Sequence, residues 1–240
     1  DFKIYNSDRV EINGDLYSNS AIDMQGSKPS FGVVSGNLIT TEEIEEGNGD
    51  LSVSGTTKDE NSVPAPTPFV LPGVDFTSLY NQANTKLMTD AALDALWSVD
   101  GITWVNTAAN IEHNMIINGQ LVVNGNLTIT NSANITINHL IGSPSGIIIT
   151  GNLNISQTPH YHSNILINGL IYATGKITIE KMNTGYTFRV TGGITSGNGI
   201  LIKNCSRTIE IIYNNDILAE SLNPSANSPV IKVEHWEEEY

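Results

Sequence analysis

The sequence predicts an all-β protein, a parallel β-helix (β-solenoid) with a short helical and loop insertion around residues 63–112. Between residues 115 and 137, the odd positions are mostly apolar and the even positions are mostly Asn, Thr, Ser or Gln, and an extended chain places every second side chain on one face. Glycines recur six residues apart, as at Gly119 and Gly125, and the same pattern returns over 165–179. Short strands joined by Gly or Asn corners are typical of solenoids.

The composition agrees with this fold class. Isoleucine (30 residues) and asparagine (28 residues) dominate the chain of 240. Isoleucine favours strands, and asparagine suits tight corners and can form hydrogen-bonded ladders between stacked strands. The net charge of −14 argues against general nucleic-acid binding, which depends on neutralising phosphates. Residues 114–213 are mildly basic, which weakens that argument without reversing it.

Residues 1–62 are predicted to form N-terminal coils. Glycine-centred strand motifs stand at Gly14, Gly36 and Gly55, at intervals of 22 and 19 residues. Three sides of six residues would make about 18, so each interval corresponds to one turn of a roughly triangular coil. Successive coils would stack at the strand spacing of ~4.8 Å.

Residues 63–112 are predicted to leave the rod as a proline-rich and helical excursion. Four prolines between residues 64 and 72 exclude a central strand. A helix is expected next, with Asp75 or Thr77 as its N-cap, and a second at residues 90–97 with Thr89 as its cap. The first helix has apolar residues at helical spacing, namely Phe76, Leu79, Tyr80, Ala83 and Leu87. Of these, Phe76, Leu79 and Leu87 should be buried on a flank of the rod.

Residues 113–240 are predicted to form the main solenoid and a C-terminal strand, so that one domain spans 1–240. The odd positions of 115–129 and 165–179 should point into one continuous core. The last segment, 229–240, is expected to be a final strand followed by an acidic tail. Cys205 is the single cysteine, so no internal disulfide can form, and a small buried core residue is expected there.

No catalytic site, metal site or cofactor is predicted. Polysaccharide lyases and pectinases on β-helices need clustered carboxylates, whereas residues 114–213 contain only Glu180 and Glu210. His160 and His162 could clamp a metal, but no Cys or carboxylate stands near them in sequence, and an exposed loop is the better interpretation. The acidic run over 42–50 does not match a calcium loop and is interpreted as a solvated loop.

Aromatic residues are the candidate ligand-binding groups, because flat rings with amide and hydroxyl neighbours suit an extended glycan. Tyr172 falls on an even, outward position and is predicted to be an exposed ring. For Trp97 and Trp104, anchoring of the insertion to the rod is an equally good interpretation. The candidate set is Trp97, Trp104, Tyr161, Tyr172 and Tyr186.

The order of the motifs resembles a known family. Ile-Asn-Gly-Asp-Leu-Tyr-Ser-Asn stands at 12–19, Val-Ser-Gly-Asn-Leu at 34–38, and the proline-rich Val-Leu-Pro-Gly-Val-Asp-Phe-Thr-Ser-Leu at 70–79; a helix, more Gly-Asn-Leu strands and a terminal Val-Ile-Lys-Val-Glu-His-Trp follow. The chain resembles the C-terminal β-solenoid domain of type IV pilus-associated (PilX-type) proteins and is similar to tapirins, bacterial surface proteins that hold cells to cellulose. The resemblance implies a pilin-like membrane anchor outside this chain and no catalytic residues.

The resulting expectation is a non-catalytic extracellular adhesion module of a type IV pilus-linked surface protein. It would bind an insoluble polysaccharide such as cellulose through exposed aromatics and outward Asn and Thr on a flat face, with avidity along the polymer. Pilus components are further expected partners, nucleic acid is not, and membrane contact would need a segment outside this chain. The chain starts at Asp1 and carries no signal peptide, so a processed or excised portion of a longer protein is expected.

Two alternatives stay open. One is a structural or accessory minor-pilin domain that binds protein or DNA. The other is a bactofilin-like self-assembling scaffold, which an exposed and uncapped coil end would favour.

Overall fold

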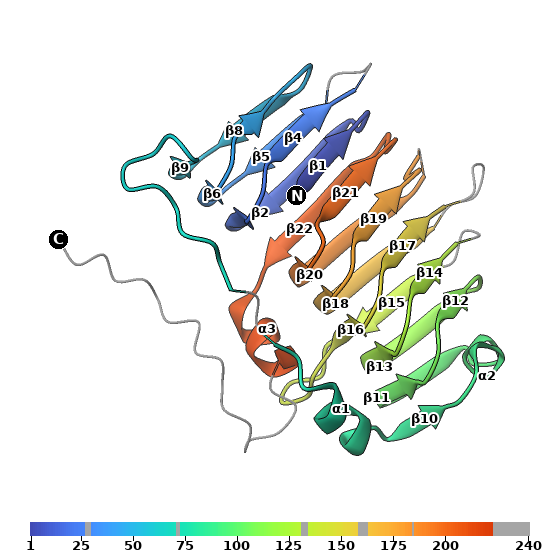
Figure 1. Cartoon of the computed structure of the whole chain (residues 1–240). Helices are drawn as coiled ribbons and strands as arrows, with labels where there is room; N and C mark the ends of the chain where they lie inside the picture. Colours follow the sequence, from blue (N-terminus) through green and yellow to red (C-terminus); the bar gives the residue numbers. More distant parts are fainter. Residues whose placement is uncertain (27–29, 71–72, 131–133, 158–162, 184, 223–240) are drawn as a thin grey trace.

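A computed structural model confirms the predicted β-solenoid. It describes residues 1–26, 30–70, 73–130, 134–157, 163–183 and 185–222. Within this part, parallel strands stack into a rod of about nine turns (Figure 1). Each full coil has three sides in the chain order wall 1, wall 2, wall 3, and the corresponding sides of successive coils pair to form the three walls of the rod.

Wall 3 is a single parallel sheet of eight short strands. In order along the rod they are β12 (Ala109–Ile111), β14 (Leu127–Ile129), β17 (Leu153–Ser156), β19 (Ile177–Glu180), β21 (Ile200–Lys203), β1 (Phe2–Tyr5), β4 (Ile22–Gln25) and β7 (Ile44–Glu45).

Walls 1 and 2 share four long strands, each with a glycine between its two halves: β11 (Ser98–Val105), β13 (Met115–Val123), β18 (Asn164–Ala173) and β20 (Thr187–Ser196). The first halves belong to wall 1, where β15 (Ile135–Asn138) pairs with them, and the second halves to wall 2, where β16 (Gly146–Ile149) does. Wall 1 continues through β22 (Thr208–Tyr213), β2 (Arg9–Asn13), β5 (Phe31–Val34) and β8 (Asp50–Val53). Wall 2 starts at β10 (Thr85–Leu87) and ends in a separate sheet of β3 (Leu16–Ser18), β6 (Leu38–Thr40) and β9 (Thr57–Lys58).

The order of coils along the rod differs from their order in the chain. β1 pairs with β21, and β2 pairs with β22, so the N-terminal coils stack on the last coil of the main solenoid. In Figure 1 the blue strands lie directly on the orange ones. The chain therefore starts in the middle of the rod, builds one end, crosses to the other end after β9, and then builds back to the middle.

The inner core follows the predicted alternation. The odd positions of 115–129 and 165–179 that carry apolar side chains are buried in one cluster, which confirms the prediction; they are Met115, Ile117, Leu121, Val123, Leu127, Ile129, Ile165, Ile167, Ile171, Ala173, Ile177 and Ile179. Cys205 is buried in the same cluster, as expected, and burial raises the pKa of its thiol to about 11.

Helix α1 (Phe76–Gln82) lies where the helical spacing predicts it. The Asp75 carboxylate is the N-cap and accepts from the Ser78 amide at 2.9 Å, and Leu79 is buried against the outer face of wall 2. The expectation that Leu87 belongs to this helix is wrong. The backbone amide of Asn84 donates to the Ile102 carbonyl, and the Asn84 side-chain oxygen accepts from the Ile102 amide. The chain therefore already pairs with a neighbouring coil at Asn84, and Leu87 packs on the inner core.

The second helix, α2 (Asp90–Asp94), is capped by Thr89 as predicted but ends three residues before the expected position 97. Leu93 is buried in the core at this end of the rod. Strands β10, β11 and β12 already pair as coils, so the excursion ends before Thr85 rather than at residue 112.

A third helix, α3 (Asn215–Leu222), was not predicted and packs on β18 and β20. The expected final strand over 229–240 lies outside the described residues. Within the described part, no helix is both long and apolar enough to cross a membrane.

Candidate functional site

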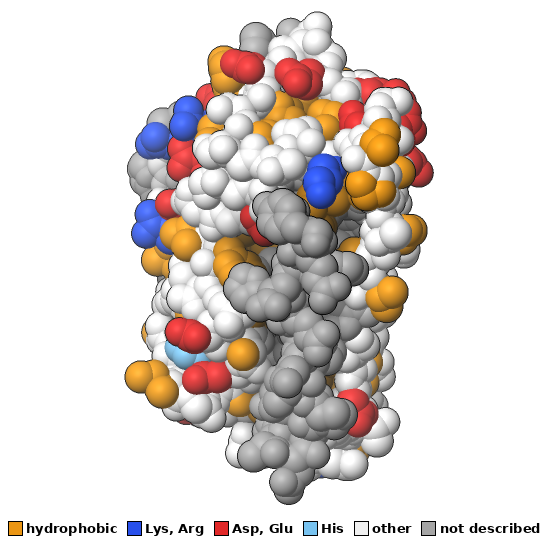
Figure 2. Space-filling model, turned by 90° about the vertical axis from the view of Figure 1, so that its left-hand side faces the viewer, with side chains coloured by type: hydrophobic (Ala, Val, Ile, Leu, Met, Phe, Trp, Pro, Cys, Tyr) orange, Lys and Arg blue, Asp and Glu red, His pale blue; other side chains and the backbone are white. Residues whose placement is uncertain are grey.

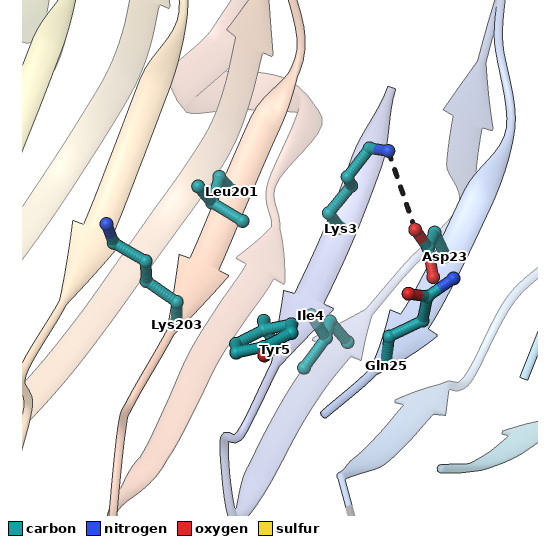
Figure 3. A pocket seen from close by; sticks show the side chains of 7 residues that line it. All are labelled: Lys3, Ile4, Tyr5, Asp23, Gln25, Leu201 and Lys203. Atoms are coloured by element: carbon teal, nitrogen blue, oxygen red, sulfur yellow. Dashed lines mark hydrogen bonds and ion pairs between the residues drawn. The ribbon is translucent and has the colours of Figure 1, made fainter. Parts of the chain in front are cut away.

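The outer face of wall 3 carries a shallow hollow of about 200 Å³ near the middle of the rod (Figure 3). Tyr5 is its aromatic component. Phe2 and Ile4 of β1 point into the core, so the alternation sends Lys3 and Tyr5 outward, and the Tyr5 side chain is 44% exposed. The side chains that line the hollow are Lys3, Ile4, Tyr5, Asp23, Gln25, Leu201 and Lys203.

The strand register brings these residues together from three strands that are far apart in sequence. Tyr5 is aligned with Lys203 of β21 on one side and with Gln25 of β4 on the other. Lys3 is aligned in the same way with Leu201 and Asp23. The hollow therefore exists only because the N-terminal coils stack on β21.

Charges in the hollow are paired with one another or with neighbours. The Lys3 ammonium lies 3.5 Å from an Asp23 oxygen, and the Lys203 ammonium lies 2.7 Å from a Glu180 oxygen. The bond from Lys203 lowers the pKa of the Glu180 carboxyl. The face around the Tyr5 ring thus offers local polar partners without a strong net charge, a combination suited to a neutral hydroxyl-rich ligand.

The hollow continues into a column of aligned outward side chains along wall 3. The strand register stacks one such residue per coil, at the sheet spacing of ~4.8 Å. On the side of the hollow toward β12 this column is neutral and polar, and its members are Asn110, Thr128, Asn154 and Thr178; on the other side Asp23 is followed by Glu45 of β7. The outward Asn and Thr expected on a flat face are therefore present on wall 3.

Three of the predicted aromatic site residues are buried, so the expectation of a stacking platform at these positions is wrong. Trp104 and Tyr172 do point away from the inner core, as the alternation requires, but α1 and α3 cover that part of wall 2. Trp104 packs edge-on against Tyr80 of α1 at 5.3 Å, which confirms its alternative interpretation as an anchor. Tyr186 is buried in the inner core.

Of the remaining two candidates, Trp97 is 68% exposed and follows α2, with its ring edge-on to His113 at a centroid distance of 5.2 Å. Tyr161 lies outside the described residues, as do His160 and His162. Tyr5 was missed, although the alternation of Phe2 and Ile4 already places it outward.

No group of three or more His, Cys, Asp or Glu side chains within the described ranges is arranged to hold a metal ion. Two glutamates of the acidic run bond neighbouring coils instead: Glu42 accepts from the Ala21 amide at 3.1 Å, and Glu45 accepts from Gln25 at 3.0 Å.

Comparisons with protein-family models, curated proteins and solved structures give no match.

Proposed function

We propose that this chain is a non-catalytic adhesion module of an extracellular, pilus-linked surface protein, and that it holds an insoluble neutral polysaccharide such as cellulose on the outer face of wall 3. The observation that carries the proposal is the exposed ring of Tyr5 on a flat parallel sheet, flanked by Gln25 and Lys203. The apolar face of a sugar ring stacks on such an aromatic, while its hydroxyls bond the polar neighbours.

The repeat of wall 3 supports an extended ligand over a small one. From β12 to β19, outward polar side chains recur once per coil at ~4.8 Å, close to the length of one hexose in an extended glycan. The hollow is shallow and does not enclose a ligand. Affinity would therefore come from many weak contacts along the polymer rather than from a single deep pocket.

The two ends of the rod argue against the self-assembling scaffold. α2 covers one end with the buried Leu93. At the opposite end, the edge strands β7 and β8 carry Glu45 and Asp50, close to the remaining acidic residues of the 42–50 run. Copies that stacked head to tail in an open filament would have to displace α2 and would bring Glu45 and Asp50 against Asp90 and Asp94 of α2.

The test is depletion of the protein from solution by crystalline cellulose, at low and high salt and with chelator present. We expect binding at both salt concentrations, because stacking and neutral hydrogen bonds are little screened. Tyr5→Ala should weaken binding about three- to tenfold, the loss of one stacking contact of ~1 kcal/mol. Tyr5→Phe should retain most of it.

Phe31→Ala is the matched control, because Phe31 is 45% exposed on β5 in wall 1, away from wall 3. Equal losses in the Tyr5 and Phe31 variants would refute the assignment to wall 3. An absence of depletion together with salt-sensitive retention on DNA would instead support the accessory-pilin alternative.

A further inference from the structure

One coil of the rod lacks a strand in wall 2. At the junction between the two parts of the chain, wall 1 contains β22 between β20 and β2, and wall 3 contains β1 between β21 and β4. In wall 2, no described strand lies between the second half of β20 and β3, which begins a separate sheet. We call this open position, bounded by residues 193–196 and by β3, the strand slot.

The burial of its two edges agrees with a missing strand. Residues 193–196 are all partly exposed, whereas the aligned residues 170–173 of β18 are all buried. On the opposite edge, Leu16 is 9% exposed, while its aligned partner Leu38 in β6 is fully buried. The inner core therefore reaches the surface at the slot, most clearly at the inward-facing Ile194.

The backbone at the slot also lacks partners among the described residues. In a parallel ladder, successive residues direct their amide and carbonyl groups to alternate neighbours. Gly197 bonds Ala173 of β18, and Gly192 accepts from Asn214 on the opposite side. Ile194 and Ser196 therefore direct their backbone groups into the slot, where they form an open strand edge.

We propose that residues 230–234 of this chain, Val-Ile-Lys-Val-Glu, insert into the strand slot as a parallel strand and complete wall 2. Their alternation fits the site: Ile231 and Val233 would face the inner core beside Ile194 and Leu16, and Lys232 would face outward. The slot is one strand wide, because walls 1 and 3 each contain one strand, β22 and β1, in the same coil.

The reach of the chain is sufficient. α3 ends at Leu222, where the Ser221 carbonyl accepts from Gln120 of β13 at 3.1 Å. The slot lies four strand positions away along wall 2, about 19 Å at the spacing of parallel strands. The eight steps from Leu222 to Val230 can span up to about 28 Å.

Another coil already shows the same chain path. After β15 the chain leaves the rod at the corner between walls 1 and 2, and it returns as β16 in wall 2. α3 leaves at the equivalent corner after β22, and it contacts this other excursion through Glu220, which lies 3.2 Å from His139. If residues 230–234 enter wall 2, α3 lies in an excursion like the one between β15 and β16. The end of the chain would then lie beside β1.

Cross-linking in the full chain tests the proposal directly. In the inserted register, Lys232 is aligned with the outward Thr195, so the double variant Thr195→Cys with Lys232→Cys should form an intramolecular bridge with a short bifunctional thiol reagent. The control pair is Thr178→Cys with Lys232→Cys, because Thr178 is outward on wall 3. Cys205 is buried and should not react.

Hydrogen exchange provides the second measurement. Ile231→Asp with Val233→Asp should raise exchange at residues 193–196 and in β3 at least tenfold, whereas Lys232→Asp should leave it unchanged. Absence of the Thr195–Lys232 bridge together with equal exchange in these variants would overturn the proposal. Bridges found only between two molecules would overturn it as well, because they would show strand exchange between copies.

Discussion

At the Gly-Asn corners of this chain, one side-chain oxygen of each asparagine accepts a hydrogen bond from a backbone amide of the next coil. The Asn126 side-chain oxygen accepts from the Asn152 amide at 2.8 Å, and Asn152 accepts in the same way from the Lys176 amide at 2.7 Å. A Cβ on Gly151 would lie only 2.4 Å from that Asn126 oxygen. Glycine leaves room for the asparagine below it, and asparagine satisfies a corner amide above it, which is the physical reason for the recurring Gly-Asn-Leu triplet.

Ile167→Asn should destabilise the rod strongly. Ile167 is fully enclosed by the inner core, so the substitution removes apolar contacts and buries an amide without partners. We expect a loss of about 3–5 kcal/mol in the free energy of unfolding, measured by denaturant titration. Leu166→Asn is the control, because Leu166 is only partly buried on the outer face of the same strand, and it should cost less than about 1 kcal/mol. Equal costs at the two positions would contradict the inward assignment.

Alternation predicts which side chains point into the rod but not which outward ones reach solvent. This limit explains both Tyr5 and Tyr172. Both stand on outward positions, yet wall 3 is open at Tyr5, while α1 and α3 cover the wall at Tyr172. α1 was predicted from its own spacing, but the position of a helix relative to a wall depends on tertiary contacts such as Leu79 against Trp104, which no local pattern contains.

At the scale of elements, strands were more predictable than helix ends. The helical spacing from Phe76 continues in sequence as far as Leu87, but the backbone of Asn84 pairs with Ile102 and ends the helix earlier. Pairing with a neighbouring coil outweighs the helix propensity of a few residues. α3 carries only a weak apolar pattern, and its contacts come from Ile217 and Leu218 against the glycines of β20.

The cross-strand pair Glu180–Lys203 should make wall 3 sensitive to pH. The lowered pKa of Glu180 means that its contribution to stability is present above the ordinary carboxyl pKa of about 4.5 and is lost as the pH falls through the lowered value. Lys203→Met should therefore cost about 1 kcal/mol at pH 7, and the difference from the parent protein should shrink near pH 3.

The control for this pair is Lys181→Met, whose ammonium is half-exposed and 3.9 Å from Glu180, against 2.7 Å for Lys203. It should cost less than Lys203→Met at pH 7. Thermal unfolding of the three proteins across this pH range measures both effects. A difference between Lys203→Met and the parent that stays constant with pH would show that the pair does not stabilise wall 3.

At the scale of the whole molecule, the sequence predicts the individual coils but not the order in which they stack along the rod. Every coil presents similar inward Ile, Leu and Val residues, so the local pattern does not specify which coil stacks on which. The prolines after residue 63 indicate an interruption, yet they do not show that the chain crosses there from one end of the rod to the other. The junction of β1 with β21, and therefore the hollow at Tyr5, depends on this crossing.

The coils stack in a different order along the rod from their order in the chain. The rod should therefore survive cleavage of the segment after β9 that crosses from one end of the rod to the other. Residues 63–65 are exposed, so a protease site inserted after Ala65 should be cleaved in the folded protein. The two fragments should remain together in size-exclusion chromatography without denaturant. Val10 and Ile4 of the smaller fragment are buried in the same core as Ile209 of the larger one, and strand ladders pair the two fragments in walls 1 and 3.

Val10→Asp in the same cleavable protein is the control for this experiment. It places a charge in the junction core, where no partner is available, and should release the N-terminal fragment after cleavage, while the uncut variant stays one chain. If the fragments of the parent protein separate as readily as those of the Val10 variant, the N-terminal coils do not stack on β21 and β22. Co-elution of the parent fragments alone would show that the junction holds the rod together without the covalent link.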